Sequence, residues 1–191
     1  MSIPGKREEI MQASLDLIAE HGFHQAPMAE IADKAGVAAG TIYRYFESKD
    51  ELINELHKAL EEDILAFIQC SYPSTRPVRE RFLYISRRLL RYFMENPIRF
   101  RYMEQYFNSP YGISLRKVRL MGKQSGNDLL SDLFRQGIDQ QIIKDLPVAV
   151  LFSLAFGPMI LLIRDHILAF CILDDALITK VTEACWDTVK R

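Results

Sequence analysis

The chain has 191 residues, of which 49% are hydrophobic and 26% are charged, and its formal net charge is -1. This is the composition of a folded protein of one or two small domains, and it excludes an intrinsically disordered chain. Because the charge is near zero, there is no general attraction to nucleic acid or membranes, and any such function must depend on a local surface.

The cysteines and the first residues bear on the cellular compartment. The three cysteines are Cys70, Cys171 and Cys185. An odd number at wide spacing indicates neither a disulfide framework nor a CxxC metal or redox site. The first residues mix acids with apolar residues and contain no continuous apolar run, so they do not form a secretory signal. We therefore predict a cytoplasmic protein without a metal or a cofactor.

The periodicity of the apolar residues predicts an all-α fold of about nine helices. Spacing of i, i+3 and i+4 recurs throughout, whereas alternation typical of strands is almost absent. The first predicted helix ends at His21-Gly22, and the second is closed by Gly36. The long fourth helix begins with a capping box of Ser48 and Glu51. In chain order, the second to fourth predicted helices cover residues 28–35, 39–46 and 48–70.

Prolines and glycines separate the remaining predicted helices. The segment 71–78 holds two prolines, and Asn96-Pro97 and "NSPYG" are further breaks. These helices cover residues 78–95, 98–108, 113–136, 148–170 and 175–190. Pro158 lies inside the fourth of them, where it removes one backbone hydrogen bond and should bend the helix.

The predicted helix 39–46 separates an apolar face from a polar one. An α-helix turns by about 100° per residue. At this step the inward side holds Ala39, Ile42 and Phe46, with Tyr43 at its edge. The outward side holds Thr41, Arg44 and Tyr45. The first set can pack on the two preceding helices, and the second presents a hydroxyl, a guanidinium and a phenol to solvent.

This arrangement indicates a helix-turn-helix. Two short helices joined by a glycine-containing turn place the second helix in the major groove of DNA. Arginine can bond guanine bidentately or pair with phosphate, and threonine can contact the thymine methyl or a phosphate. Gly40 removes a side chain where the DNA would approach. The alternative is that the tyrosines of this stretch only pack within a small helical bundle.

The stretch "MAEIADKAGVAAGTIYRYFESKDELI", preceded by "IMQASLDLIAEHGFHQ", resembles the DNA-binding domain of the TetR family of transcriptional regulators. The matching pieces are Ile31-Ala32, Ala35 to Val37, Gly40 to Phe46 and Ser48 to Leu52. Their order and spacing agree with the family. The similarity covers roughly the first quarter to third of the chain, and the remainder matches the family only in length and helicity.

The resemblance implies the residues that contact DNA. Thr41, Tyr43, Arg44 and Tyr45 take the contacting positions of the recognition helix, and Lys49 takes a phosphate contact. The full predicted DNA-binding set is Ala39, Gly40, Thr41, Tyr43, Arg44, Tyr45 and Lys49. Two positions depart from the family, because Ala38 and Pro27 stand where a capping serine or threonine is common. Pro27 can serve instead as the first helical residue, which fixes φ.

The predicted domains are a helix-turn-helix unit at 1–50, which continues into the connecting helix 48–70, and an effector-binding and dimerisation unit at 51–191. Residues 1–50 contain five basic and eight acidic residues, a net charge of -3. A dimer presents the few cations twice, on half-sites one helical turn or a multiple of it apart. We therefore expect modest non-specific affinity and a shallow dependence on salt.

Arginines and aromatic residues alternate between residues 76 and 107. Eight arginines and two acids fall between Arg76 and Arg101. One interpretation is a solvated arginine face over an aromatic core. The other is a pocket for an aromatic or anionic effector, which is also the location that the resemblance implies for a ligand chamber. The candidate lining residues are Phe67, Tyr84, Arg88, Phe93, Tyr102, Met103, Tyr106 and Phe107. A second nucleic-acid surface on the arginines is less favoured.

The last two predicted helices are more apolar than a thin helical layer requires. Residues 147–163 form the most apolar run of the chain, but Gly157-Pro158 interrupts it and Arg164, Asp165 and His166 follow it. A membrane span needs about 20 apolar residues, so we expect no membrane association. The resemblance implies that these two helices form a four-helix homodimer interface. The alternative is an ordinary intramolecular core.

Catalysis has little support in the sequence. The four histidines are not at metal-ligand spacing, and there is no phosphate-binding loop or nucleophile elbow. His166 beside Asp165 is expected to be a pair on a helix surface. We predict a transcriptional regulator that binds double-stranded operator DNA, a repressor released by a small molecule, and not an enzyme. The rival prediction is a helical ligand-binding protein that keeps the helix-turn-helix as a scaffold.

Overall fold

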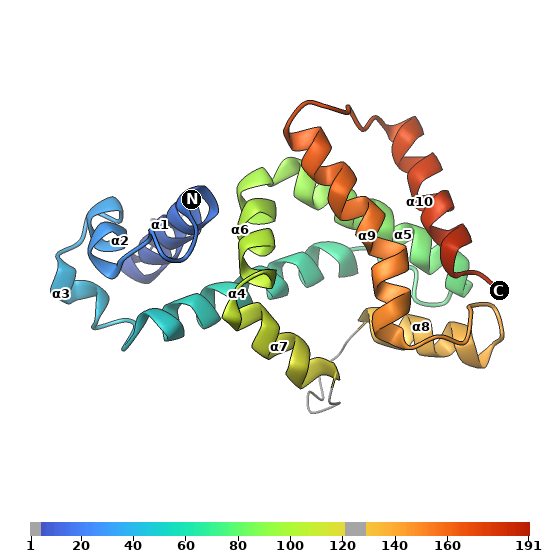
Figure 1. Ribbon diagram of the computed structural model, residues 1–191, viewed down its shortest axis with the longest axis horizontal. Coiled ribbons are helices and arrows are strands. Elements are labelled where there is room, and N and C mark those ends of the chain that lie inside the picture. Colours follow the sequence, from blue (N-terminus) through green and yellow to red (C-terminus); the bar gives the residue numbers. More distant parts are fainter. Residues whose placement is uncertain (1–4, 121–128) are drawn as a thin grey trace. The chain divides into compact units, whose positions relative to one another are not determined.

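The computed structural model describes residues 5–120 and 129–191, and within these ranges it contains ten helices and one isolated antiparallel bridge. The all-α prediction is confirmed. The helices, labelled in Figure 1, are α1 (Lys6–His21), α2 (Met28–Lys34), α3 (Ala39–Ile42), α4 (Lys49–Gln69), α5 (Val78–Glu95), α6 (Pro97–Phe107), α7 (Pro110–Leu120), α8 (Leu129–Asp139), α9 (Val148–Ile167) and α10 (Asp175–Val189).

Most predicted boundaries agree with the structure to within a few residues. Half of the predicted capping box is confirmed, since the Glu51 N–H donates to Ser48 Oγ at 3.1 Å. The Glu51 carboxylate accepts from the N–H of Glu47, one residue before the N-cap. The predicted helix 113–136 corresponds at its two ends to α7 and α8. Its middle, residues 121–128, lies outside the described residues.

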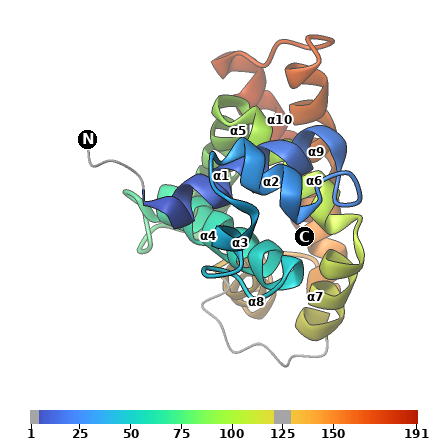
Figure 2. The same ribbon diagram turned by 90° about the vertical axis from the view of Figure 1, so that its left-hand side faces the viewer.

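The chain divides into two compact units. The first contains the chain up to Asp63 and the segment from Asn96 to the end of α7. The second contains Ile64–Glu95 and the chain from α8 to the C-terminus. In the first unit α1 packs on α2 and on α6, and the neighbouring positions of α1 and α2 are visible in both Figure 1 and Figure 2.

The second unit is built around α5, which packs on α8, α9 and α10. The ring of Phe82 on α5 lies at its centre, with ring centroids 6.4 Å from Phe134, 6.0 Å from Phe156 and 5.3 Å from Trp186. The end of α10 is tied to the segment after α8, because the Lys144 N–H donates to the carbonyl of Val189 at 2.9 Å. These contacts bury the apolar faces of four helices in one core.

Helix α9 has more apolar surface than this core covers. It continues through Pro158 and buries Leu151, Phe156 and Ile163, among others. Among the described residues it is the one helix long and apolar enough to cross a membrane by length and composition, yet only 28% of its most apolar window is buried. A core helix would bury more, so the uncovered face needs a separate explanation.

Close approach of backbone fixes the start of α7. Ser109 precedes the helix, and its hydroxyl donates to the carbonyl of Tyr106 at 2.6 Å. A Cβ on Gly112 would meet the Tyr106 carbonyl oxygen at 2.3 Å and the Cα of Phe107 at 2.7 Å. Helix α7 begins at Pro110, three residues before the predicted start, because Ser109-Pro110 starts a helix as well as ending one.

We predict that Gly112→Ala lowers the free energy of unfolding by about 1–3 kcal/mol, because the new methyl group must push apart two stretches of backbone. Thermal and denaturant unfolding would measure the change. The control is Gly40→Ala, whose Cβ would meet nothing within 4 Å. Equal stability of the Gly112→Ala variant and the wild type would contradict the close approach of α6 and α7.

Candidate nucleic-acid interface

The turn between α2 and α3 has the geometry of a Schellman motif. The Val37 N–H donates to the carbonyl of Ala32 and the Gly36 N–H to that of Asp33, both at 3.0 Å. Gly36 has a φ of 64° and open space around its Cα, so its backbone conformation is the reason for glycine there. The motif ends α2 and directs the chain into α3.

Helix α3 is shorter than the sequence suggested. It ends at Ile42, and the Arg44 and Tyr45 N–H groups donate to the carbonyls three residues earlier, Thr41 and Ile42. This is the tighter pattern of a 3₁₀ turn. The prediction of a helix over 39–46 is therefore wrong for its second half, where residues 43–45 form a turn, although the Phe46 N–H still donates to the carbonyl of Ile42 at 3.0 Å.

Burial confirms part of the predicted division into faces. Ile42 and Phe46 are 0% and 1% exposed, as predicted. Ala39 is exposed instead of inward. Tyr43 is 56% exposed and Tyr45 42% exposed. The Tyr43 ring, expected at the edge of the core, is therefore mostly in solvent.

Arg7 of α1 fixes the end of this segment. Its guanidinium carbon lies 5.3 Å from the centroid of the Phe46 ring, and its Nη2 pairs with the carboxylate of Glu55 on α4. One side chain therefore joins α1, α4 and the end of residues 39–46, which we call the recognition segment. The contact holds Phe46 in the core and orients the residues that precede it.

Four polar side chains of this segment make no internal polar contact. Within the described residues, no hydrogen bond, ion pair or ring contact involves the side chains of Thr41, Tyr43, Arg44 and Tyr45. The nearby basic residues, in contrast, have internal partners. Lys6 pairs with Glu9 at 2.8 Å, Lys34 with Asp16 at 4.0 Å, and Arg7 with Glu55. Arg44 is thus a guanidinium available to an external partner.

Lys49, the predicted phosphate contact, is half-buried at the start of α4. Its Nζ donates to the backbone carbonyl of Phe23, in the loop between α1 and α2. Burial lowers the pKa of Lys49, and the charge of Asp50 partly opposes that shift. An ammonium has three donors, so the contact with Phe23 orients the group and leaves donors for a phosphate.

The structure has no capping side chain at two helix starts where the family commonly has one. Ala38 and Pro27 occupy the N-cap positions of α3 and α2, and neither helix has a side-chain cap. We had predicted Pro27 as the first residue of α2, but it is the residue before the helix. A missing cap typically costs about 1 kcal/mol, which leaves the short α3 dependent on the burial of Ile42.

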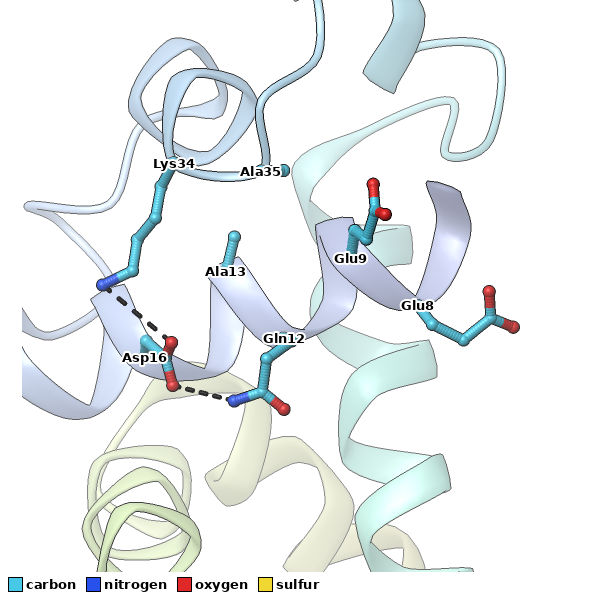
Figure 3. A pocket seen from close by; sticks show the side chains of 7 residues that line it. All are labelled: Glu8, Glu9, Gln12, Ala13, Asp16, Lys34 and Ala35. Carbon is cyan, nitrogen blue, oxygen red and sulfur yellow. Dashed lines mark hydrogen bonds and ion pairs between the residues drawn. The ribbon is translucent and has the colours of Figure 1, made fainter. Parts of the chain in front are cut away.

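A surface pocket of about 410 Å³ lies between α1 and α2. Figure 3 shows Asp16 between Gln12 and Lys34, with Glu8 and Glu9 further along α1. The side chain of Gln12 donates to Asp16 at 2.9 Å. Among the described residues no group of His, Cys, Asp and Glu has the arrangement of a metal site. The pocket is acidic, so it repels phosphate.

The predicted effector-lining residues fall into two groups, one in each unit. In the first unit the ring centroids of Tyr102 and Tyr106 are 6.1 Å apart, and those of Phe107 and Tyr106 are 6.2 Å apart. Tyr102 is fully buried, its hydroxyl donates to the Ile53 carbonyl at 3.3 Å, and burial raises its pKa. Met103 is also buried. These residues form the apolar side of α6.

The other group lies in the second unit. The guanidinium carbon of Arg88 lies 3.6 Å from the centroid of the Phe67 ring, and its Nε donates to the Phe67 carbonyl at 3.1 Å. The Phe67 ring lies 5.2 Å from Tyr92, which lies 5.4 Å from Phe93. Tyr84 donates to the carbonyl of Cys70. Phe67, Arg88 and Phe93 thus form one cluster, with Tyr84 on the same helix.

Sequence reasoning missed three buried polar groups. The His57 ring is 4% exposed and stacks on Tyr106 at 3.6 Å between centroids, with Nε2 3.3 Å from the Glu61 carboxylate. The contact of His57 Nε2 with Glu61 lacks hydrogen-bond geometry, so both His57 nitrogens, like Ser86 Oγ and Arg87 Nε, are buried without a hydrogen-bond partner. Polar residues at core positions of α4 and α5 were the available signal, but the many arginines of α5 concealed it.

Most arginines of α5 are already paired. Arg79 pairs with Glu183 at 2.5 Å, and Arg91 with Asp175 at 2.8 Å. Arg81 donates to the Tyr72 hydroxyl at 2.8 Å. These pairs argue against a second nucleic-acid surface on α5.

His166 has a structural contact, because its Nδ1 accepts from the Leu173 N–H at 3.1 Å.

Comparison with known proteins agrees with this geometry. The model of bacterial regulatory proteins of the tetR family matches residues 10–56, and that of the tetracyclin repressor-like C-terminal domain matches residues 77–190. The chain belongs to the TetR family of transcriptional regulators. An HTH-type transcriptional regulator of Haemophilus influenzae is 26% identical over 184 residues, which cover 96% of this chain and 95% of that protein.

Solved structures of relatives extend over the whole chain. A TetR-family regulator from Haemophilus influenzae has a TM-score of 0.82 at 26% identity, covering 97% of both chains. A putative TetR-family regulator from Vibrio parahaemolyticus has a TM-score of 0.79 at 30% identity, covering 98% of this chain and 99% of that one. The fatty acid metabolism regulator protein of Bacillus subtilis is 42% identical over 67 residues, which cover 31% of this chain and 34% of that protein.

Proposed function

We propose that this TetR-family regulator binds its operator as a homodimer through the outward residues of the α3 segment, and that it is a repressor released by a small-molecule effector. The group of unpaired side chains at Thr41, Tyr43, Arg44 and Tyr45 carries the proposal. Exposed polar groups without internal partners, next to two buried anchors, are suited to contacts with another molecule.

The chemistry of these groups suits a duplex. The guanidinium of Arg44 can donate two parallel hydrogen bonds to guanine, and the hydroxyls of Thr41 and the tyrosines can contact phosphates or bases. Ala39 and Gly40 are exposed and small, which allows close approach of the DNA. Lys49 supplies a phosphate contact. With so few cations, sequence readout carries more of the affinity than in a strongly basic protein.

The dimer proposal is supported by the outer face of α9. Exposed apolar side chains continue along it and into the loop that follows, and the set is Val150, Phe152, Leu154, Ile160, Leu161, Leu168, Phe170 and Ile172. A patch of this kind marks an interaction site. Two-fold pairing of α9 and α10 with the same helices of a second copy would cover it, and it would bring two recognition segments to one operator.

The effector proposal is supported by α5. Its Ser86 and Arg87 carry buried polar atoms without a partner, and Arg88 retains donors beyond those it gives to Phe67. The Phe67 ring beside Arg88 suits an aromatic or anionic ligand with a polar group. The release mechanism is a population shift, in which the ligand binds better to a conformation whose recognition segments do not match successive major grooves.

We predict that Arg44→Ala weakens operator binding by about 10-fold or more, because a bidentate arginine–guanine pair is worth about 1–3 kcal/mol. The operator would be selected from random duplexes with the wild-type protein, and fluorescence anisotropy would measure affinity. The matched control is Arg101→Ala, an exposed arginine on α6 of the same unit. If no duplex is selected, the helix-turn-helix serves only as a scaffold. If Arg44→Ala binds the selected duplex like the wild type, Arg44 does not read the operator.

We predict that Leu161→Glu raises the dimer dissociation constant by about 100-fold or more, because the two-fold interface contains residue 161 twice, and each copy loses an apolar contact and must bury a charge. Leu161 is 56% exposed in the single chain. Sedimentation would measure the change. The control, Ile98→Glu, alters a comparably exposed isoleucine of the first unit, and dissociation of that variant instead would contradict an interface on α9.

We predict that Arg87→Gln and Arg88→Gln each raise the ligand concentration needed for half-release of the operator by about 10-fold, since hydrogen bonds to charged groups are worth about 1.5–3 kcal/mol. The compounds to be screened are aromatic carboxylates and fatty acids. Fatty acids are included because one relative is the fatty acid metabolism regulator protein of Bacillus subtilis. The control is Arg91→Gln, which breaks an exposed ion pair. Unchanged release by every active compound would count against these residues.

A further inference from the structure

Phe23 lies in the loop between α1 and α2, inside a group of tyrosines from two distant helices. Its ring centroid is 6.0 Å from Tyr102 and 6.4 Å from Tyr106, both on α6. It is 5.5 Å from Tyr111, on α7. Tyr106 and Tyr111 are themselves stacked at 6.3 Å. The loop that leads into the helix-turn-helix is therefore held by residues far along the chain.

The first two residues of α4 are tied to the same group. Lys49 Nζ donates to the Phe23 carbonyl. The Tyr111 hydroxyl donates to the carboxylate of Asp50. Phe23 is thus fixed twice, by its ring and by its carbonyl, and α7 reaches α4 both directly and through Phe23. Three segments that are far apart in the sequence therefore meet beside Lys49: the loop with Phe23, the start of α4 and α7.

The Tyr111 hydroxyl is a dependable donor in this arrangement. Partial burial, together with the bond to Asp50, raises the pKa of Tyr111 to about 12. The hydroxyl therefore keeps its proton throughout the physiological range of pH. Asp50 accepts the bond beside the ammonium of Lys49, so loss of the hydroxyl would free a carboxylate next to the proposed phosphate contact.

We propose that Tyr111 is a positioning residue for operator binding: it fixes Asp50 and Phe23, and through them it aims the Lys49 ammonium at a DNA phosphate. The inference rests on the proposed operator contact of Lys49. Without the clamp, the long lysine side chain and the start of α4 must be ordered when DNA binds, and that ordering lowers affinity. Contact with Asp50 would also draw the ammonium away from phosphate.

The position of Tyr111 in the chain makes the contact suitable for control. Helix α7 belongs to the first unit, and the chain after it leads to α8 of the second. A change that draws α7 away from α4 would release Asp50 without disturbing the buried anchors Ile42 and Phe46. Operator affinity would then fall while the recognition segment stays folded.

The test is operator binding by the full-length dimer with Tyr111→Phe, which removes the hydroxyl and keeps the ring. We expect affinity about 5-fold weaker, since one hydrogen bond to a charged acceptor is lost. We also expect the slope of log affinity against log salt to shrink by up to about 0.9 per subunit, the contribution of one phosphate contact. A purely structural defect would reduce the active fraction and leave that slope unchanged.

Two further variants make the outcome decisive. Tyr72→Phe is the matched control, since it removes a hydroxyl that accepts a hydrogen bond from Arg81 in the other unit, and it should change neither affinity nor slope. In Lys49→Gln the slope is already reduced, and adding Tyr111→Phe should have no further effect. Wild-type binding by Lys49→Gln would overturn the lysine contact itself. Weak binding by Lys49→Gln with normal binding or slope for Tyr111→Phe would overturn only the positioning role.

Discussion

The burial of Ile42 and Phe46 is the constraint on which the recognition surface depends. Both side chains are almost fully removed from water, and the chain between them is only three residues long. Tyr43, Arg44 and Tyr45, which lie between them in a turn, are exposed. Apolar burial therefore supplies the free energy that holds the segment, and no polar group of its outer side is needed for folding.

The helix-turn-helix does not stand as a separate body in this chain. Its compact unit includes α6 and α7, which come after the whole of α5 in sequence. Tyr102 of α6 donates to a carbonyl of α4, and Phe23 before α2 lies among three tyrosines of α6 and α7. The orientation of the recognition segment is thus set by residues that a boundary at residue 50 would assign to the effector unit.

The sequence predicts local features of the chain but not its long-range contacts. The bounds of α5 at Val78 and Glu95 were predictable because prolines lie just outside the helix. The end of α2 was predictable because the turn that follows it requires a glycine, Gly36. The early end of α3 escaped prediction, since no glycine or proline marks it. Pairs such as Arg7 with Glu55, or Tyr111 with Asp50, join residues tens of positions apart. Single-sequence periodicity does not encode such pairs, so the clamp on Lys49 was invisible.

The net negative charge of residues 1–50 has a physical consequence for selectivity. Four of its five cations already have internal partners in the described chain, which leaves Arg44 as the free one. Non-specific binding comes from phosphate contacts, so a surface with little spare positive charge binds random DNA weakly. The acids beside Lys34 reduce it further. Specific binding then depends on a few well-aimed groups, and the precision with which the core holds Lys49 and Arg44 matters more than the total charge.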